Sequence, residues 1–381
     1  MKGVLKKGIA AFCVAMLCVF ALAGCSSGSA SSSGSASSAS ASAASASALA
    51  SAASTSASAA SASASASSAV AMVKDMKGDD AIAAGTAKTV LTANSVATQM
   101  VLMVGGESAV ADLGQGFNNA EGSLNSKMYP GLSGLKVMTR DDVTVENVAA
   151  LDPSLVIIDV PDTVTALREA GINAAYMSVT SPETIMDAID LLGNAIGGEA
   201  ANKAKAYRTL YEGQLKEFAA KAANVADADK PHVLYLRSET RTIGEGSMPD
   251  NWITTVGGVN VGAELGAQGG AGSDVTTEAI IGANPDIIVC ERPELLETIT
   301  KDAQYANIAA VQNGKVYQAP FGTAVWSMGT AEAVCMLPWA GTIINPDLYA
   351  DVNLDNLTTD FFKDFYGYTL TQADLDGIFH R

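Results

Sequence analysis

The sequence predicts an α/β protein made of two Rossmann-like lobes joined by a single long interdomain helix. One motif occurs twice, and an amphipathic segment of about 25 residues lies between its two copies. Strand-like apolar runs alternate with helix-like segments around each copy, which is typical of parallel sheets covered by helices. The copies lie too far apart for a solenoid, whose repeats are about 20 to 50 residues long.

The duplicated motif begins at Asp142 and again at Asp274, and the two copies match without a gap. Each copy reads as a threonine cap, a short helix, an Asx-Pro turn and a buried strand. A glutamate lies in the first turn of each helix, Glu146 in one copy and Glu278 in the other. Because the helix dipole favours a carboxylate there, a purely local role for both glutamates is one interpretation.

Residues 1–24 are predicted to be a lipoprotein signal peptide. Lysines precede an apolar run that is too short for a comfortable membrane span, and the run ends in Leu-Ala-Gly-Cys, which resembles the bacterial lipobox. Cys25 is therefore the predicted lipidation site, with an uncleaved anchor helix as the alternative. Residues 25–70 are rich in Ser and Ala and are predicted to form a flexible tether.

The formal net charge of −17 argues against nucleic acid as a partner, because binding phosphates requires a basic face. The acidity predicts a soluble chain. Only Cys290 and Cys335 fall in the predicted folded part. In an exported protein they could form a disulfide, but both stand in apolar runs, so buried free thiols are an equal expectation.

The N-terminal lobe is expected over residues 71–198. A polar, glycine-rich loop runs from Gly114 to Pro130 and lacks the third glycine of a dinucleotide fingerprint. It is either a surface loop or a wall of a ligand cleft. The expected strands are 88–93, 108–113, 135–138, 155–160 and 173–177, and the expected helices are 95–103, 163–170 and 182–196.

The connecting helix is expected over residues 199–224, since apolar side chains recur there every three or four positions. The C-terminal lobe follows over residues 225–381. Its expected strands are 232–237, 286–290 and 315–318. Its expected helices are 250–256, 277–283, 293–298 and 331–339, and an aromatic closing helix is expected near 361–368.

The chain resembles the class III solute-binding proteins of ABC importers. The resemblance rests on the lipobox, the tether, the two lobes and three phrases at 257–261, 284–288 and 361–368. It implies a monomeric, lipid-anchored, extracytoplasmic protein that captures an iron complex, either a ferric siderophore or haem. The implied partners are an ABC permease and its ATPase. Cobalamin and molybdate or tungstate remain alternative ligands.

In that family, a surface glutamate on each lobe docks into arginine pockets of the two permease subunits. The resemblance carries this role to Glu146 and Glu278, which match by position in the duplicated motif. Paired acidic residues on pseudo-symmetric lobes suit a two-fold partner, and complementary charges fix the register of docking.

The ligand is expected between the lobes, at the carboxyl ends of the strands. Arginines there would suit carboxylates or oxyanions, and aromatic rings would suit a macrocycle or a catechol. The C-terminal lobe offers Arg237, Glu239, Arg241, Ser247, Arg292 and Trp326. The N-terminal lobe offers Asn94, Ser95, Asn118, Tyr129 and Arg140. Each could equally be an ordinary surface or packed side chain.

An enzyme is the main alternative class. His232 and His380 are the only histidines, and neither a Gly-x-Ser-x-Gly nor a Cys-x-x-Cys motif occurs in the predicted folded part. Catalytic residues, a metal site and a cofactor are therefore not expected. A lipid-anchored sensor or adhesin on the same fold remains a second alternative.

Overall fold

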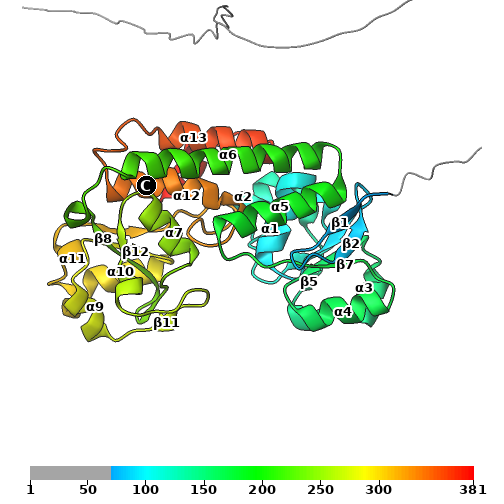
Figure 1. The fold of residues 1–381 in the computed structure, drawn as a ribbon, viewed down its shortest axis with the longest axis horizontal. Coiled ribbons are helices and arrows are strands. Elements are labelled where there is room, and N and C mark those ends of the chain that lie inside the picture. Colours follow the sequence, from blue (N-terminus) through cyan, green and yellow to red (C-terminus); the bar gives the residue numbers. More distant parts are fainter. Residues whose placement is uncertain (1–69) are drawn as a thin grey trace, which may run out of the picture. The chain divides into compact units, whose positions relative to one another are not determined.

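One α/β unit precedes helix α6 and another follows it (Figure 1). The computed structural model describes residues 70–381, so the predicted signal peptide, Cys25 and nearly all of the predicted tether lie outside the described residues. We call the described residues before α6 lobe one and those after it lobe two. Both belong to one compact unit.

Lobe one begins with a short antiparallel hairpin and continues with strands and helices in alternation. Its elements are β1 (Met72–Lys74), β2 (Asp80–Ala83), β3 (Val90–Leu91), α1 (Ser95–Gly105), η1 (Glu107–Ala109), β4 (Leu113–Gly114), α2 (Leu124–Met128), η2 (Pro130–Leu132), β5 (Val137–Met138), η3 (Arg140–Asp142), α3 (Val145–Leu151), β6 (Leu155–Ile158), α4 (Pro161–Glu169), β7 (Ala174–Tyr176) and α5 (Pro182–Ile196).

The lobe-one sheet is parallel, as predicted. Its order is β3-β6-β7, and β4 pairs with β5 in a separate parallel ladder. Two isolated bridges, Val90 to Val110 and Asn94 to Gln115, connect the β4 side of this ladder to β3. The short central strands are buried on both faces, which explains their unbroken apolar runs.

Helix α6 (Glu199–Ala222) leads into lobe two. The further elements are η4 (Asp227–Asp229), β8 (His232–Ser238), β9 (Arg241–Thr242), α7 (Met248–Thr255), β10 (Val259–Asn260), α8 (Val261–Glu264), β11 (Ser273–Asp274), α9 (Thr277–Ala283), β12 (Ile287–Cys290), α10 (Pro293–Lys301), η5 (Ala303–Tyr305), α11 (Ala309–Gln312), β13 (Val316–Gln318), η6 (Ala331–Cys335), α12 (Met336–Ile344), α13 (Leu354–Phe361), η7 (Phe362–Tyr366) and α14 (Gln372–Phe379).

The lobe-two sheet is mixed rather than purely parallel. Strands β8, β12 and β13 are parallel, but β9 and β11 add an antiparallel edge in the order β11-β9-β8-β12-β13. Strand β10 also pairs with β8 in parallel. The antiparallel edge arises because β9 folds straight back onto β8 within the segment that the sequence presents as a loop.

The duplicated motif is one structural unit in both lobes. Thr144 caps α3 by accepting from Asn147 N–H at 3.2 Å, and Thr276 caps α9 by accepting from Ala279 N–H at 3.1 Å. Both helices end at a left-handed residue, Asp152 with φ 47° and the equivalent asparagine with φ 45°. The match continues beyond the predicted motif, because α4 and α10 begin and end at equivalent positions.

Alternate residues of the two motif strands face different cores. Leu155 in β6 and Ile287 in β12 face an inner core, and the next residue of each strand faces an outer core of its own lobe. Helices α3 and α4 supply the outer core of lobe one, and α9 and α10 supply that of lobe two. Each sheet is therefore covered by helices on both faces, as predicted.

Helix α6 confirms the predicted connector and packs on both lobes (Figure 1). It contacts α1 and α5 of lobe one and α7 and α12 of lobe two. Tyr207, Tyr211 and Phe218 lie on its buried face, as the spacing predicts. Since the inner core contains residues of both lobes, the C-terminal helices join the lobes through shared apolar packing as well as through α6.

Several predicted elements differ from the structure. The predicted strand 108–113 is a 3-10 turn followed by a strand at Leu113 only. The strand predicted over 88–93 stops at Leu91, because Ala93 turns into the left-handed region with φ 55°. The predicted closing helix is the end of α13 followed by the π-helical turn η7. Cys290 and Cys335 are buried free thiols, not a disulfide.

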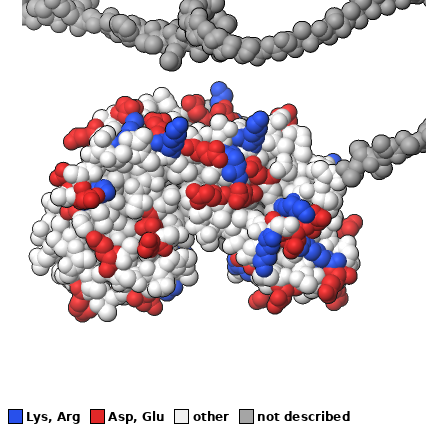
Figure 2. Space-filling view, viewed as in Figure 1, with Lys and Arg blue, Asp and Glu red and all other residues white. Residues whose placement is uncertain are grey.

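On the face drawn in Figure 2, acidic and basic side chains are intermixed without a continuous basic area. Among residues 70–381, no helix combines the length and the apolar character that crossing a membrane requires.

Candidate functional site

A cavity of about 690 Å³ lies where the carboxyl ends of β8 and β12 in lobe two meet the start of α1 in lobe one. Its size falls in the range of about 300–1,000 Å³ that is usual for sites of drug-sized ligands. The lobe-one lining is Ser95, Val96, Gly116, Phe117 and Val179. The lobe-two lining is Arg237, Glu291, Arg292, Pro293, Glu294, Gln318, Phe321, Thr323, Ala324, Val325, Met328, Gly329 and Thr330.

The start of α1 is held at the cavity by a buried carboxylate. Asp112 accepts hydrogen bonds from Thr92 N–H at 2.7 Å and from Ala93 N–H at 3.0 Å, which fixes the sharp turn after β3. Burial raises the pKa of Asp112, although these bonds act in the opposite direction. Asn94 then caps the helix by accepting from Ala97 N–H at 2.9 Å.

Close backbone contact completes this turn. A Cβ atom on Gly114 would lie 2.1 Å from the Asn94 carbonyl carbon, so only glycine lets β4 approach the turn. Ser95 and Val96 therefore line the cavity at the first turn of α1, where backbone N–H groups and the helix dipole favour an anionic group.

The lobe-two wall carries two arginines, one hydrogen-bonded to Glu291 and one that lies only at ion-pair distance from it. Arg237 Nε donates to Glu291 Oε2 at 2.8 Å, and the Tyr235 hydroxyl donates to the same oxygen at 2.8 Å. The Glu291 side chain is only 9% exposed. Arg292 is 70% exposed, and its Nε lies 3.9 Å from Glu291 Oε1, beyond hydrogen-bond distance. Arg292 is thus available to a ligand.

The remaining wall is a turn with apolar side chains. Phe321 and Val325 form an antiparallel bridge that closes this turn, and Phe321 remains 38% exposed. Phe117 and Met328 also line the cavity. Two arginines and two glutamates give the lining no formal net charge. The cavity therefore combines apolar surface with one largely exposed arginine, which suits a large ligand with an acidic group.

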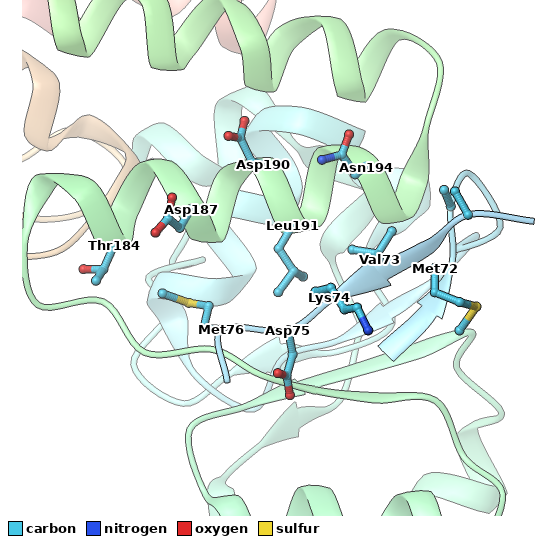
Figure 3. A pocket seen from close by; sticks show the side chains of 12 residues that line it. Met72, Val73, Lys74, Asp75, Met76, Thr184, Asp187, Asp190, Leu191 and Asn194 are labelled. Atoms are coloured by element: carbon cyan, nitrogen blue, oxygen red, sulfur yellow. The ribbon is translucent and has the colours of Figure 1, made fainter. Parts of the chain in front are cut away.

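A second cavity of about 640 Å³ lies on lobe one between β1 and α5 (Figure 3). Its charged side chains are all engaged within the fold. Asp187 and Asp190 bind Arg208 at 2.7 and 2.6 Å, Asp75 binds Arg168 at 2.7 Å, and Lys74 binds its strand partner at 2.5 Å. Each charged side chain of this cavity thus has an ion-pair partner within the fold.

Of the residues predicted to contact ligand, Arg237, Arg292 and Ser95 line the large cavity, and Asn94 caps the helix that begins there. Arg140 instead pairs with Asp159 through two bonds of 2.5 and 2.6 Å. Arg241 pairs with Asp274 at 3.1 Å at the far edge of the sheet. These pairings are local to one lobe.

Other predicted contacts also lie elsewhere. Trp326 is fully buried and donates its indole N–H to Glu332 at 2.7 Å, so it offers no face to the cavity. Ser247 is buried as the cap of α7, and Tyr129 is buried against Tyr366. Two predicted contacts remain exposed outside the cavity lining. They are Asn118, which lines a smaller pocket beside α14, and Glu239.

Several lining residues were missed from the sequence. Glu291 could have been found, since it follows the motif strand at the position equivalent to Asp159. Phe117, Phe321 and Met328 carry no signal in the sequence, because turns between elements bring them together only in three dimensions.

The motif glutamates lie away from the cavity lining. Glu146 and Glu278 are both exposed in the first turns of α3 and α9, as the duplicated motif predicts. No group of three or more His, Cys, Asp or Glu side chains that could hold a metal ion occurs among residues 70–381.

A model of the family described as periplasmic binding protein matches residues 90–322. The chain therefore belongs to this family, whose members are solute-binding proteins that work with ABC transporters rather than enzymes. The molybdate-binding protein MolA of Haemophilus influenzae is 27% identical over 143 residues, which are 36% of this chain and 40% of MolA. The match thus spans less than half of that relative.

Solved structures agree with the two-lobe fold. A periplasmic solute-binding protein from Veillonella parvula has a TM-score of 0.72 and 27% identity, covering 81% of this chain and 97% of its own. MolA with bound molybdate has a TM-score of 0.69 and 16% identity, covering 79% and 99%. CeuE of Helicobacter pylori with bound Ni(II) has a TM-score of 0.64 and 20% identity, covering 80% and 98%. The last two resemblances concern the fold alone.

Proposed function

We propose that this chain is the solute-binding component of an ABC importer and that it captures an extracytoplasmic iron complex, a ferric siderophore or haem, in the large cavity. The supporting observation is the lining itself: the apolar side chains of Phe117, Phe321 and Met328 lie beside Arg292, whose side chain is 70% exposed. A volume of about 690 Å³ suits a chelate whose rings pack against these side chains and whose acidic group binds the Arg292 guanidinium.

A small oxyanion such as molybdate is the second candidate. Sequence similarity to MolA favours it, as does the first turn of α1 at the cavity. Two features favour the iron complex over it. The oxyanion would leave most of the apolar lining in water, and it would meet a wall whose formal charges cancel. Cobalamin would use the same apolar surface.

Delivery is proposed to use the motif glutamates. Glu146 and Glu278 present exposed carboxylates at equivalent places in the two lobes, which suits basic pockets on two permease subunits. The predicted lipid on Cys25 would keep the protein beside the membrane, with residues 25–70 as the tether. Replacing Cys25 with alanine should abolish covalent attachment of labelled fatty acid, and a variant that still takes up the label would contradict lipidation at this residue.

Calorimetric titration of the full-length chain tests the ligand. The probes are iron(III) with a catecholate chelator, haem, cobalamin and sodium molybdate. Saturable binding of an iron complex and not of molybdate supports the first candidate, and the reverse result supports the second. A sensor or adhesin on the same fold becomes the better interpretation if none of the four probes binds.

A further inference from the structure

Glu332 is a fully buried carboxylate that stands behind the cavity rather than in its lining. It accepts hydrogen bonds from Thr323 N–H, at 3.1 and 3.0 Å to its two oxygens, from the Thr323 hydroxyl and from the Trp326 indole at 2.7 Å. None of the hydrogen-bond donors it meets among the described residues is a cation. Burying a carboxylate costs free energy unless hydrogen bonds satisfy its oxygens, so these donors are needed to hold Glu332 in the fold.

The groups that Glu332 holds form the apolar wall of the cavity. Thr323, Ala324 and Val325 all line the cavity, and the turn that they form runs from Phe321 to Trp326. A Cβ atom on Gly322 would lie 2.2 Å from Glu332 Oε2, so the turn is folded tightly around the carboxylate. The position of this wall therefore depends on Glu332.

The same turn is bonded to lobe one. Gln99 of α1 is buried, donates through Nε2 to the Thr323 hydroxyl at 2.6 Å and accepts at Oε1 from Ala331 N–H at 3.0 Å. Asn125 of α2 donates to the Thr323 carbonyl at 3.0 Å. Helix α1 also supplies the opposite, lobe-one side of the cavity through Ser95 and Val96. A single chain of bonds thus spans both walls.

We propose that Gln99, Thr323 and Glu332 form a positioning relay that sets the spacing of the two cavity walls, so that ligand retention depends on a carboxylate that never touches the ligand. The Glu332 oxygens can only accept when ionised, and they fix the direction of the Thr323 hydroxyl. That hydroxyl then accepts a hydrogen bond from Gln99, and this bond fixes the position of the lobe-two turn relative to α1. Burial makes every bond of the relay stronger than a surface bond of the same kind.

Only the ligand-binding test of the relay rests on the proposed function. A ligand-free readout uses two equivalent exposed positions, Glu169 at the end of α4 and Lys301 at the end of α10. Cysteines at both positions accept spin labels in a full-length chain with Cys13, Cys18 and Cys25 replaced by serine, because the remaining Cys290 and Cys335 are buried. The spread of label-to-label distances then reports how firmly one lobe is registered on the other.

Three variants carry the test. Glu332→Gln places an amide N–H₂ donor against the Thr323 and Trp326 donors, so some of these hydrogen bonds are lost. Gln99→Met removes both hydrogen bonds of this side chain to lobe two. Tyr349→Phe is the matched control, since it deletes one buried bond of 3.1 Å to the Phe218 carbonyl, outside the cavity lining. The relay predicts a broader distance distribution in the first two variants and an unchanged one in the control.

Ligand kinetics give the second readout. With whichever of the four probes binds the natural protein, Glu332→Gln and Gln99→Met should each raise the dissociation rate by about tenfold or more while the association rate changes much less. The dissociation rate of the double variant should be little higher than that of either single variant, because both substitutions break the same relay.

Additive effects on the dissociation rate, or unchanged distances in both variants, would overturn the relay. If no probe binds the natural protein, the proposed function fails, and the label distances still decide whether the relay exists.

Discussion

Asp159 and Glu291 occupy equivalent positions at the ends of the two motif strands, and each binds an arginine of its own lobe. Asp159 accepts from Arg140 at 2.5 Å, and Glu291 accepts from Arg237 at 2.8 Å. Only the second pair lines the cavity. An acidic residue thus follows both motif strands, but its arginine comes from η3 in lobe one and from β8 in lobe two. The packing of α1 and the 321–326 turn brings just one of the two pairs to the cavity.

Replacing Arg292 with alanine should weaken ligand binding about tenfold to a hundredfold, since a hydrogen bond to a charged group contributes about 1.5–3 kcal/mol. Arg140→Ala is the matched control, because its guanidinium is engaged by Asp159 outside the cavity lining. Calorimetric titration with the best-binding probe measures both. Equal losses in the two variants would remove Arg292 from the site.

Replacing both Glu146 and Glu278 with alanine should abolish uptake into cells and leave ligand affinity unchanged, because both carboxylates are exposed and absent from the cavity lining. Uptake of labelled ligand and calorimetric titration are the two measurements. Glu169→Ala with Glu297→Ala removes exposed glutamates from α4 and α10 as the control. Normal uptake in the first double variant would exclude the docking role.

Asp374 should make the protein lose stability in strong acid. Burial raises its pKa, but hydrogen bonds from Lys127 and Thr371 outweigh burial and hold the pKa at about 2, against an ordinary 3.8. Because the folded pKa is the lower one, its stabilisation is present above pH 3.8 and is lost as the pH falls toward 2. Urea unfolding of Asp374→Asn should show a flatter pH dependence in this range.

Half of the Lys127 side chain is exposed, so solvent screens this pair, and we expect on the order of 1–2 kcal/mol from it. Parallel pH curves for the natural protein and the variant would contradict the assignment.

Glu332 should act with the opposite sign. Burial raises its pKa above the ordinary 4.5, although hydrogen bonds from Thr323 and Trp326 lower it. The folded state therefore holds the proton more tightly, and stability declines as the pH rises from 4.5 toward the folded pKa. Glutamine does not titrate, so the stability of Glu332→Gln relative to the natural protein should increase as the pH rises from acid to neutral. Urea unfolding at several pH values measures this difference. A difference in stability that does not change with pH would argue against a raised pKa of Glu332.

Two glycine substitutions should differ in sign. Gly114→Ala would force a Cβ against the Asn94 backbone, and we expect a loss of about 1–3 kcal/mol together with weaker ligand binding as the start of α1 shifts. Gly213→Ala lies in α6 with nothing within 4 Å of the new Cβ. It should raise the free energy of unfolding by up to about 1 kcal/mol. Thermal unfolding distinguishes the two.

Much of the fold could be predicted because its signals are local. The helix α9 begins and ends at the predicted residues, since Thr276 caps it and Asn284 ends it in the left-handed region. The connector was predicted from one apolar stripe, and its buried tyrosines confirm the stripe. Of the strand predicted over 108–113, Ser108 and Ala109 belong to a 3-10 turn, and Leu113 begins β4. Strand β9 lies in a segment that the sequence presents as a loop.

The cavity was predicted less completely, for a physical reason. Arg237 and Arg292 follow buried strands, and a parallel sheet brings such residues to one edge, so the sequence points to them. Trp326 also follows a strand, β13, but its indole points into the core and donates a hydrogen bond to the buried Glu332. The periodicity of the sequence does not distinguish a residue that lines the cavity from one that is buried in the core. The difference depends on which side chain packs against the turn from a distant part of the chain.

The sequence by itself determined that two α/β lobes repeat one motif and that a long helix joins them, because caps, turns and periodicity act over a few residues. Only the tertiary structure decided which strand ends form the cavity, that Trp326 belongs to the core, and that Glu332 holds one wall against α1. These facts depend on contacts between residues more than 200 positions apart, such as Gln99 and Thr323. Contacts of that kind leave no trace in a local pattern.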